Sequence, residues 1–254
     1  MAEIDESKAF INELLDARVN LMKTLIEVVG EDLGDTDCEA VYHNYMDQGF
    51  MMGGAGGFFM GNGVYTGNAS LAGLTVDDLR TSVFTHAKPQ YLGACLSALS
   101  KYGSLIGLTE KGKVFVLAQM ALESGGFIFT YELGRGKGKK YGVPAGPYGK
   151  IYYGRGPIQI TWENNYKTIA YNIFPKMGIN ANIHAYPELC EMNLEIGCAA
   201  SLAWFMLSGN GKRAIQYAND GNVKELTHMI NGGYAHLNER IKYTEALLTK
   251  TQIN

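Results

Sequence analysis

Apolar side chains recur every three or four residues along several stretches of the chain, a spacing that predicts amphipathic helices. The clearest stretch is 112–123, where one face carries Val114, Leu117, Ala118, Ala121 and Leu122. Further helices are predicted at 5–29, 88–101, 163–174, 194–208, 222–230 and 236–249. The pattern contains neither strand-rich regions nor alternating strands and helices. It therefore predicts a mainly α fold.

The ends of two helices are marked by their sequence. Thr75-Val76-Asp77-Asp78 resembles a capping box at a helix start, and Ser124-Gly125-Gly126 is typical of a helix end. Glu123 is therefore expected at a helix C-terminus, sharing a face with Gln119. The helix dipole is negative at that end, which is unfavourable for a carboxylate and suits a general acid.

Residues 127–157 are rich in glycine, lysine, tyrosine and proline and lack periodicity, which predicts a long functional loop. The loop leads into Gly154-Arg155-Gly156-Pro157, a tight backbone arrangement, and then into alternating apolar and polar residues. Ile158 and Ile160 should face one way, and Gln159 and Thr161 the other. Polar groups between aromatic rings suit a sugar, which has hydroxyl edges and C–H faces.

The composition of the chain favours a folded domain with an appendage. Of its 254 residues 46% are hydrophobic, enough for a sizeable core. Residues 74–254 are predicted to form the main domain, and 1–73 an accessory segment with an acidic helix and a Gly-rich apolar stretch at 49–73. That stretch packs on the main domain, contacts a partner, or lies near a membrane surface.

Charge is divided unevenly along the chain. Residues 1–60 carry three basic and twelve acidic side chains, whereas residues 101–160 carry nine basic and three acidic ones. The second segment is expected to attract an anionic substrate or surface. Its lysine run, 137–140, is too short to argue for nucleic acid, and it also fits a solvated loop.

Neither the cysteines nor the histidines show metal-ligand spacing. The four cysteines form no CxxC pair, so they are interpreted as buried free thiols, with a structural disulfide as the alternative. No metal site and no cofactor are predicted. The acidic N-terminus lacks the features of a signal peptide, and no apolar run reaches the ~18 residues of a membrane span, so synthesis in a cytoplasm is expected.

Two glutamates nine residues apart are candidates for acid–base chemistry. Glycoside hydrolysis uses one carboxylic acid to protonate the leaving oxygen and a second carboxylate across the bond. Glu123 and Glu132 fit these roles, although the same spacing is common among surface groups.

The order of several motifs adds specificity. Glu123-Ser124-Gly125-Gly126-Phe127, Tyr131-Glu132-Leu133, Tyr153–Thr161, Asn165-Tyr166 and Asn231-Gly232-Gly233 with Arg240 follow one another. In this order the chain resembles glycoside hydrolase family 19 from about Leu74 to Leu248, and its phage endolysin branch more than the plant chitinases. Leu122, Leu133 and Ala235-His236 depart from the family pattern, which bears on acid tuning and subsite shape.

The resemblance implies a role for each matching residue. Glu123 corresponds to the general acid, Glu132 to the general base, and Thr161 to the hydroxyl residue that helps hold the attacking water. Arg240 is expected near the acidic pair, where it would keep Glu132 ionised. Substrate binding is assigned to Gln159, Asn165, Asn231, Tyr153 and Arg240. The rings of Tyr152, Tyr153, Trp162 and Tyr166 either stack on sugars or pack internally.

The resemblance implies a lysozyme-like, bilobal helical domain with a substrate cleft. Its expected function is that of a muramidase or endolysin, cleaving β-1,4 bonds of peptidoglycan with inversion. Its partners would be peptidoglycan glycan strands, without nucleic acid or stable membrane insertion. The chain would be made in the host bacterial cytoplasm and reach the cell wall through a holin or on a virion. The alternatives are a chitinase acting on chitin oligomers and an inactive glycan-binding or structural virion protein.

Overall fold

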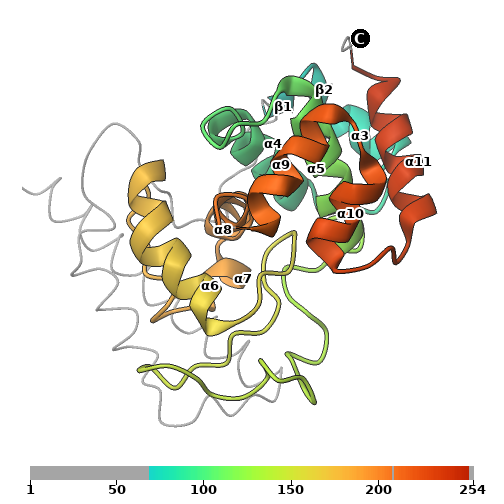
Figure 1. Cartoon of the computed structure of the whole chain (residues 1–254). Coiled ribbons are helices and arrows are strands. Elements are labelled where there is room, and N and C mark those ends of the chain that lie inside the picture. Colours follow the sequence, from blue (N-terminus) through green and yellow to red (C-terminus); the bar gives the residue numbers. More distant parts are fainter. Residues whose placement is uncertain (1–68, 208, 252–254) are drawn as a thin grey trace, which may run out of the picture. The chain divides into compact units, whose positions relative to one another are not determined.

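Helices dominate the part of the chain that the computed structural model describes, residues 69–207 and 209–251 (Figure 1). The predicted mainly α class is confirmed. The predictions for the helix at 5–29, for most of the Gly-rich stretch and for Cys38 lie outside the described residues.

The elements follow one another with short connections, apart from one long segment between α5 and α6. Their bounds are β1 Ser70–Leu71, β2 Leu74–Thr75, α3 Val76–Ser82, α4 Pro89–Tyr102, α5 Glu110–Glu123, α6 Glu163–Thr168, the π-helix η1 Ile169–Ile173, the 3-10 helix η2 Phe174–Met177, α7 Leu189–Met192, α8 Leu194–Trp204, α9 Asn210–Asp220, α10 Val223–Asn231 and α11 Leu237–Leu248. β1 and β2 pair antiparallel, Leu71 opposite Leu74.

Helix α8 connects two groups of helices. It packs against α4 on one side and against α7 and η1 on the other, and it lies between these groups in Figure 1. Its residues from Ile196 to Ala203 are buried. Gly197 allows α8 to approach α7 closely, because a Cβ there would lie 2.3 Å from the carbonyl oxygen of Cys190.

Helix α5 is a core helix that carries a polar face. Residues from Gly112 to Ala121 are buried, and the helix packs against α9 and α11. It ends where the sequence predicted. The Ser124 hydroxyl donates to the Met120 carbonyl at 2.6 Å, and Gly125 has the positive φ typical of a helix end. Glu123 is therefore fixed at the last position of a rigid element.

The predicted cap of α3 is also confirmed. The backbone N–H of Asp78 donates to the Thr75 hydroxyl oxygen at 3.2 Å, which satisfies one of the free donors at the helix start. Just before the cap, Leu71 is 3% exposed, and β1 packs against α4. The described unit thus includes residues upstream of the predicted boundary at 74.

Three elements differ from the sequence-based expectation. Helix α9 was not predicted, although its polar and apolar residues lie on separate faces; its buried residues Gly211, Ala214 and Ala218 are all small. The predicted helix 163–174 changes hydrogen-bonding type after Thr168, and the helix predicted to reach residue 208 ends at Trp204.

The described cysteines are buried free thiols, as predicted. Cys95 on α4 and Cys198 on α8 bring their Sγ atoms to 3.1 Å. Burial raises the pKa of the Cys190 thiol to about 12, so this thiol stays protonated at neutral pH. Within residues 69–207 and 209–251, no helix is long and apolar enough to cross a membrane.

Candidate active site

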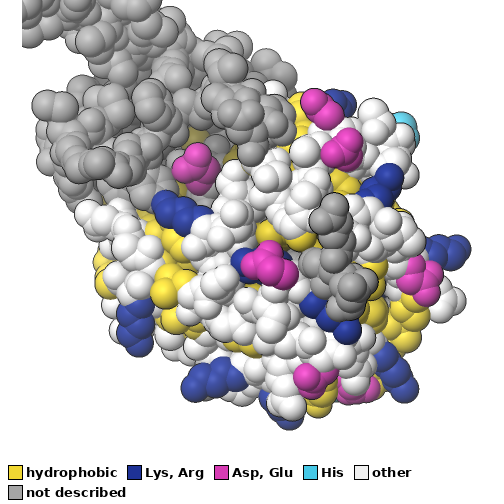
Figure 2. Space-filling model, turned by 90° about the horizontal axis from the view of Figure 1, so that it is seen from above, with side chains coloured by type: hydrophobic (Ala, Val, Ile, Leu, Met, Phe, Trp, Pro, Cys, Tyr) yellow, Lys and Arg dark blue, Asp and Glu magenta, His cyan; other side chains and the backbone are white. Residues whose placement is uncertain are grey.

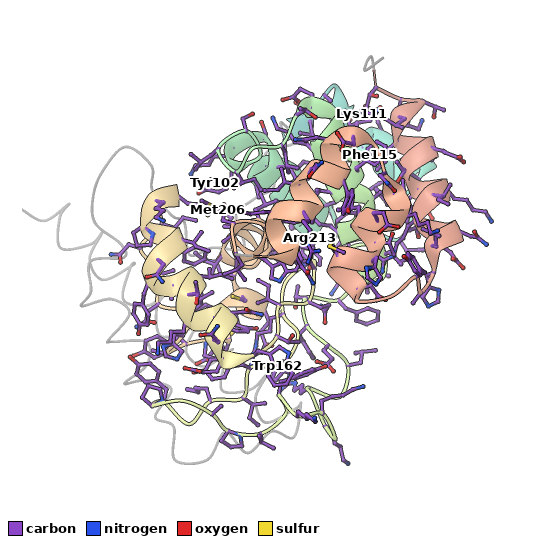
Figure 3. The ribbon with its side chains drawn as sticks, viewed as in Figure 1. Tyr102, Lys111, Phe115, Trp162, Met206 and Arg213 are labelled. Carbon is purple, nitrogen blue, oxygen red and sulfur yellow. The ribbon has the colours of Figure 1, made fainter. Side chains whose placement is uncertain are left out.

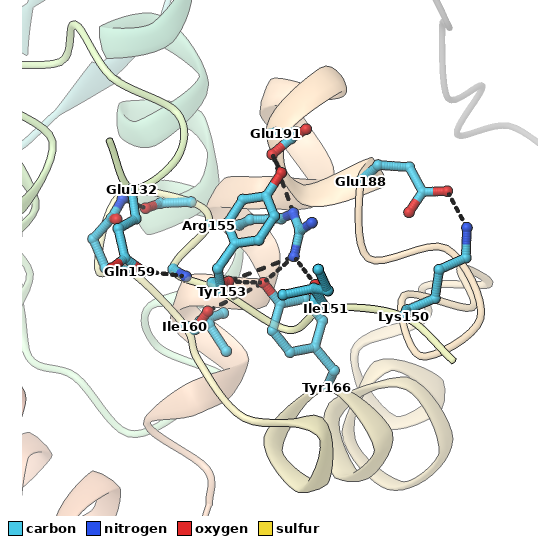
Figure 4. A network of polar contacts seen from close by, with 12 residues as sticks. Glu132, Lys150, Ile151, Tyr153, Arg155, Gln159, Ile160, Tyr166, Glu188 and Glu191 are labelled. Atoms are coloured by element: carbon cyan, nitrogen blue, oxygen red, sulfur yellow. Dashed lines mark hydrogen bonds and ion pairs between the residues drawn. The ribbon is translucent and has the colours of Figure 1, made fainter. Parts of the chain in front are cut away.

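The long segment after α5 folds into three short backbone pieces that lie side by side. Tyr131 pairs with Arg155, and Arg155 pairs with Ile160. The N–H of Glu132 donates to the Gly154 carbonyl at 2.7 Å, which holds the first two pieces together. This pairing brings the side chains of Glu132 and Gln159 together, since both lie close to where a Cβ on Gly154 would be. Figure 4 shows the two side chains next to each other.

The Glu132 carboxylate accepts two hydrogen bonds from uncharged donors. The N–H of Gly154 donates to its Oε2, and the Tyr141 hydroxyl donates to its Oε1, both at 3.0 Å. A Cβ on Gly154 would lie 2.7 Å from Oε1 of Gln159 and 3.2 Å from Oε2 of Glu132. The absence of a side chain at 154 is therefore what allows this contact.

Glu123 has a different support, a buried arginine from α11. Nη2 of Arg240 donates to Oε1 of Glu123 at 2.5 Å, and Nη1 donates to Oε1 of Gln119. Gln119 lies one turn earlier on α5 and donates in turn to the Thr227 hydroxyl at 3.3 Å. The predicted shared face of Gln119 and Glu123 is confirmed, and Arg240 is what this face binds.

The predicted role of Arg240 needs correction. It was expected to keep Glu132 ionised and to bind substrate, but its guanidinium pairs with Glu123, and the residue is 1% exposed. The reason is the packing of α11 directly against α5, whereas Glu132 lies in the loop after α5. Arg240 therefore positions Glu123 and has almost no surface to offer a glycan.

Tyr153 is likewise not an open platform for a sugar. It is 6% exposed, its hydroxyl donates to Oε2 of Glu191 at 2.9 Å, and the Arg155 guanidinium lies 3.5 Å from its ring centroid. Arg155 also donates from Nε to the same Glu191 oxygen at 3.1 Å. The Tyr166 hydroxyl completes the network by donating to the Tyr153 carbonyl at 2.9 Å (Figure 4).

This buried network fixes both residues that flank Gly154. It thereby holds the N–H that donates to Glu132. Glu191, its acidic member, was missed by the sequence analysis, because a lone carboxylate on the short helix α7 carries no motif. In the sequence, only Gly154-Arg155-Gly156-Pro157, which contributes Arg155 to this network, indicated an ordered backbone.

The predicted alternation of buried apolar and exposed polar side chains is confirmed. Ile158 and Ile160 are buried, while Gln159 and Thr161 are partly exposed. The backbone is a turn rather than a strand, since Gln159 has a φ of +57° and its N–H donates to the Gly156 carbonyl. A left-handed backbone at a non-glycine residue is a strained feature typical of functional sites.

The other predicted substrate residues lie at or near helix ends. Asn165 in α6 donates from Nδ2 to the Thr161 carbonyl at 2.9 Å, so the two residues are held together. Asn231 is the last residue of α10 and is exposed. Substrate binding by these side chains, and water binding by Thr161, stay predictions.

Of the four rings considered for stacking, Trp162 is the accessible one. It is 48% exposed at the start of α6 (Figure 3). Its ring meets the Tyr141 ring edge-on, with centroids 5.5 Å apart. Tyr152 and Tyr166 are buried, and the Tyr152 hydroxyl donates to the His184 carbonyl at 2.7 Å.

Charged side chains of both signs occur around the described unit. On the face shown in Figure 2, Lys and Arg side chains are interspersed with Asp and Glu side chains. Within the loop between Glu132 and Tyr141, the lysines at 137, 139 and 140 are exposed.

Several endochitinases are similar to this chain in sequence. An endochitinase of Arabidopsis thaliana is 42% identical over 78 residues, which cover 29% of this chain and 26% of that protein. A basic endochitinase of Brassica napus is 29% identical over 145 residues, covering 54% of this chain and 50% of that protein. The chain thus matches between about a quarter and a half of the length of these relatives. No family model matches the chain.

Solved structures of chitinases share the fold. Chitinase C from Streptomyces griseus HUT6037 has a TM-score of 0.51 at 26% identity, covering 74% of this chain and 98% of that one. A bacterial family 19 chitinase has a TM-score of 0.51 at 23% identity, covering 70% and 93%. These relatives are chitinases, and the endolysin branch stays a prediction. The described chain therefore has the fold of the family 19 chitinases and is related to chitinases in sequence.

Proposed function

We propose that this chain is a glycoside hydrolase that cleaves β-1,4 bonds in chitin-type polymers of N-acetylglucosamine. The observation that carries the proposal is the pair of carboxylates on separate, ordered supports. Glu123 is held at the end of α5 by Arg240, and Glu132 is held in the loop by Gly154 and Tyr141. The chitinase relatives favour this substrate over the peptidoglycan predicted from the sequence.

In the proposed mechanism the two carboxylates divide the proton transfers. Glu123 protonates the glycosidic oxygen through Oε2, the oxygen that Arg240 does not bond, while Glu132 removes a proton from water on the other side of the sugar. Two uncharged donors stabilise the charge of Glu132, which suits a base that must be ionised before the reaction. Thr161 helps hold the water, and the anomeric configuration inverts.

The amide side chains are proposed to bind the glycan. Gln159 lies beside Glu132, and Asn165 is tied to Thr161. Both side chains are partly exposed, and Asn231 is exposed at the end of α10. Amides of this kind match the hydroxyl and acetamido groups of N-acetylglucosamine.

Peptidoglycan remains the second candidate because of one observation. The exposed lysines 137, 139 and 140 lie in the segment that joins Glu132 to Tyr141. Positive charge next to a glycan site suits a polymer whose peptides are anionic.

The purified chain should be incubated in parallel with N-acetylglucosamine hexamers and with purified peptidoglycan. We expect the hexamer to be cut, with the α-anomer appearing first by proton NMR, and Glu123→Gln to lower the rate by at least about 100-fold. Equal rates for Glu123→Gln and the unsubstituted protein would refute the hydrolase proposal. Cleavage of peptidoglycan alone would replace chitin by the second candidate, and binding without cleavage would indicate a glycan-binding protein.

A further inference from the structure

Tyr141 has a defined position although it lies in the long loop after α5. Its ring contacts the ring of Trp162, and its hydroxyl reaches Oε1 of Glu132. The loop around it folds tightly back on itself, since a Cβ on Gly142 would lie 1.8 Å from the Gly136 carbonyl oxygen. Only glycine fits at 142, so the residue next to Tyr141 is held against the loop backbone.

The tightly folded loop around Tyr141 also packs against the buried network of Tyr153, Arg155 and Glu191. A Cβ on Gly136 would lie 3.2 Å from Cβ of Tyr153, and Tyr153 is fixed through Glu191 and Arg155. The position of the Tyr141 hydroxyl therefore depends on buried packing as well as on the loop itself.

We propose that Tyr141 is a positioning residue for Glu132, so that the loop supplies one of the two donors that orient the carboxylate for catalysis. This inference rests on the proposed function and deepens it. With Gly154 on Oε2 and Tyr141 on Oε1, both oxygens of Glu132 are fixed, and the plane of the carboxylate is set by two elements far apart in the loop. Trp162 holds the ring from which the hydroxyl projects.

The phenol remains a hydrogen-bond donor over the whole working range of pH. Burial, together with the hydrogen bond to Glu132, raises the pKa of Tyr141 to about 12. Tyr141 thus keeps its proton at acidic and neutral pH. It acts as a fixed donor rather than as an acid.

The proposal is tested by Tyr141→Phe, which keeps the ring and its contact with Trp162 and removes only the hydroxyl. We expect kcat on the chitin hexamer to fall about tenfold with KM changed less than twofold, because one charge-assisted hydrogen bond to Glu132 is lost.

Tyr148→Phe is the matched control in the same loop. The Tyr148 hydroxyl lies 3.1 Å from the Tyr171 hydroxyl and bonds to that residue, so its loss should leave both kcat and KM unchanged. If Tyr141→Phe retains the kcat of the unsubstituted protein, or if Tyr148→Phe lowers kcat equally, the proposal is wrong.

A second measurement separates this proposal from the proposed function. In protein carrying carbon-13 glutamate, the Glu132 carboxyl signal is assigned by its loss in Glu132→Gln. Its chemical shift should change in Tyr141→Phe, which removes a hydrogen bond to Oε1, and stay the same in Tyr148→Phe. This readout does not need turnover. An inactive protein with the expected NMR shift would overturn the hydrolase proposal alone, and an active one without the shift would overturn the role of Tyr141 alone.

Discussion

Single residues determine how the two carboxylates of the site are held. Arg240 is buried and directs its guanidinium nitrogens to Glu123, Gln119 and the Ala235 carbonyl. The Glu123 carboxyl among these partners is itself 16% exposed. Removing one partner of a buried hydrogen-bonded pair is costly, because the polar group left behind has no partner.

Arg240→Met should therefore reduce both stability and activity. We expect the free energy of unfolding, measured by urea denaturation, to fall by about 3 kcal/mol, and hydrolysis to fall with it, since Glu123 loses its orientation. Glu239→Gln is the control on the same helix. Glu239 is exposed and lies 3.8 Å from His236, so the change should be within about 0.5 kcal/mol. An equal loss in both variants would contradict the role assigned to Arg240.

At the scale of elements, glycine permits two close approaches that have different consequences. At Gly154 the nearest atoms to an added Cβ belong to the side chains of Gln159 and Glu132, which are able to move. At Gly197 the nearest atom is a backbone oxygen of α7, which is not free to move. The close approach at Gly154 allows the hydrogen bond to Glu132, and the close approach at Gly197 allows α8 to pack against α7.

The two alanine substitutions should consequently separate activity from stability. Gly154→Ala should lower kcat by at least about tenfold while its melting temperature stays within a few degrees, because the displaced groups are the candidate catalytic ones. Gly197→Ala should lower the melting temperature by more than Gly154→Ala does, because its Cβ strains the α7–α8 contact. Calorimetry measures the melting temperatures of the two variants, and the hexamer assay measures their kcat. Normal turnover by Gly154→Ala would contradict the role assigned to Gly154.

At the scale of the whole molecule, the described unit begins before the predicted domain boundary. The prediction divides the chain into an accessory segment, 1–73, and a catalytic domain, 74–254. In the structure β1 pairs with β2 and packs against α4, and Leu71 is buried. The described unit therefore makes use of residues just before position 74.

Two truncated chains test this boundary. A chain beginning at residue 69 keeps β1, whereas a chain beginning at residue 74 loses it together with Leu71. We expect the second to be less stable than the first by about 2 kcal/mol, the value of burying one leucine side chain. Equal urea midpoints would show that β1 is dispensable. Hexamer turnover by the chain from 69 should match that of the full chain if residues 1–68 are accessory, and a clear loss would give them a part in catalysis.

The sequence by itself determined the features that depend on neighbouring positions. The period of apolar residues located α5, the Ser-Gly-Gly signal located its end at Glu123, and the alternation from Ile158 to Thr161 predicted which side chains are buried. These features arise from contacts within a few residues, so they can be recognised in one sequence. Helix α9 has the same helical period and was missed, since its buried residues are all small.

Tertiary structure alone decided which groups meet at the site. Arg240 reaches Glu123 across 117 positions and does not support Glu132, while Glu132 takes its donors from Tyr141 and Gly154. Tyr153 likewise meets a distant part of the chain, since its hydroxyl donates to Glu191, 38 positions away. Such pairings follow from how distant elements pack, and side-chain periodicity carries no information about that packing.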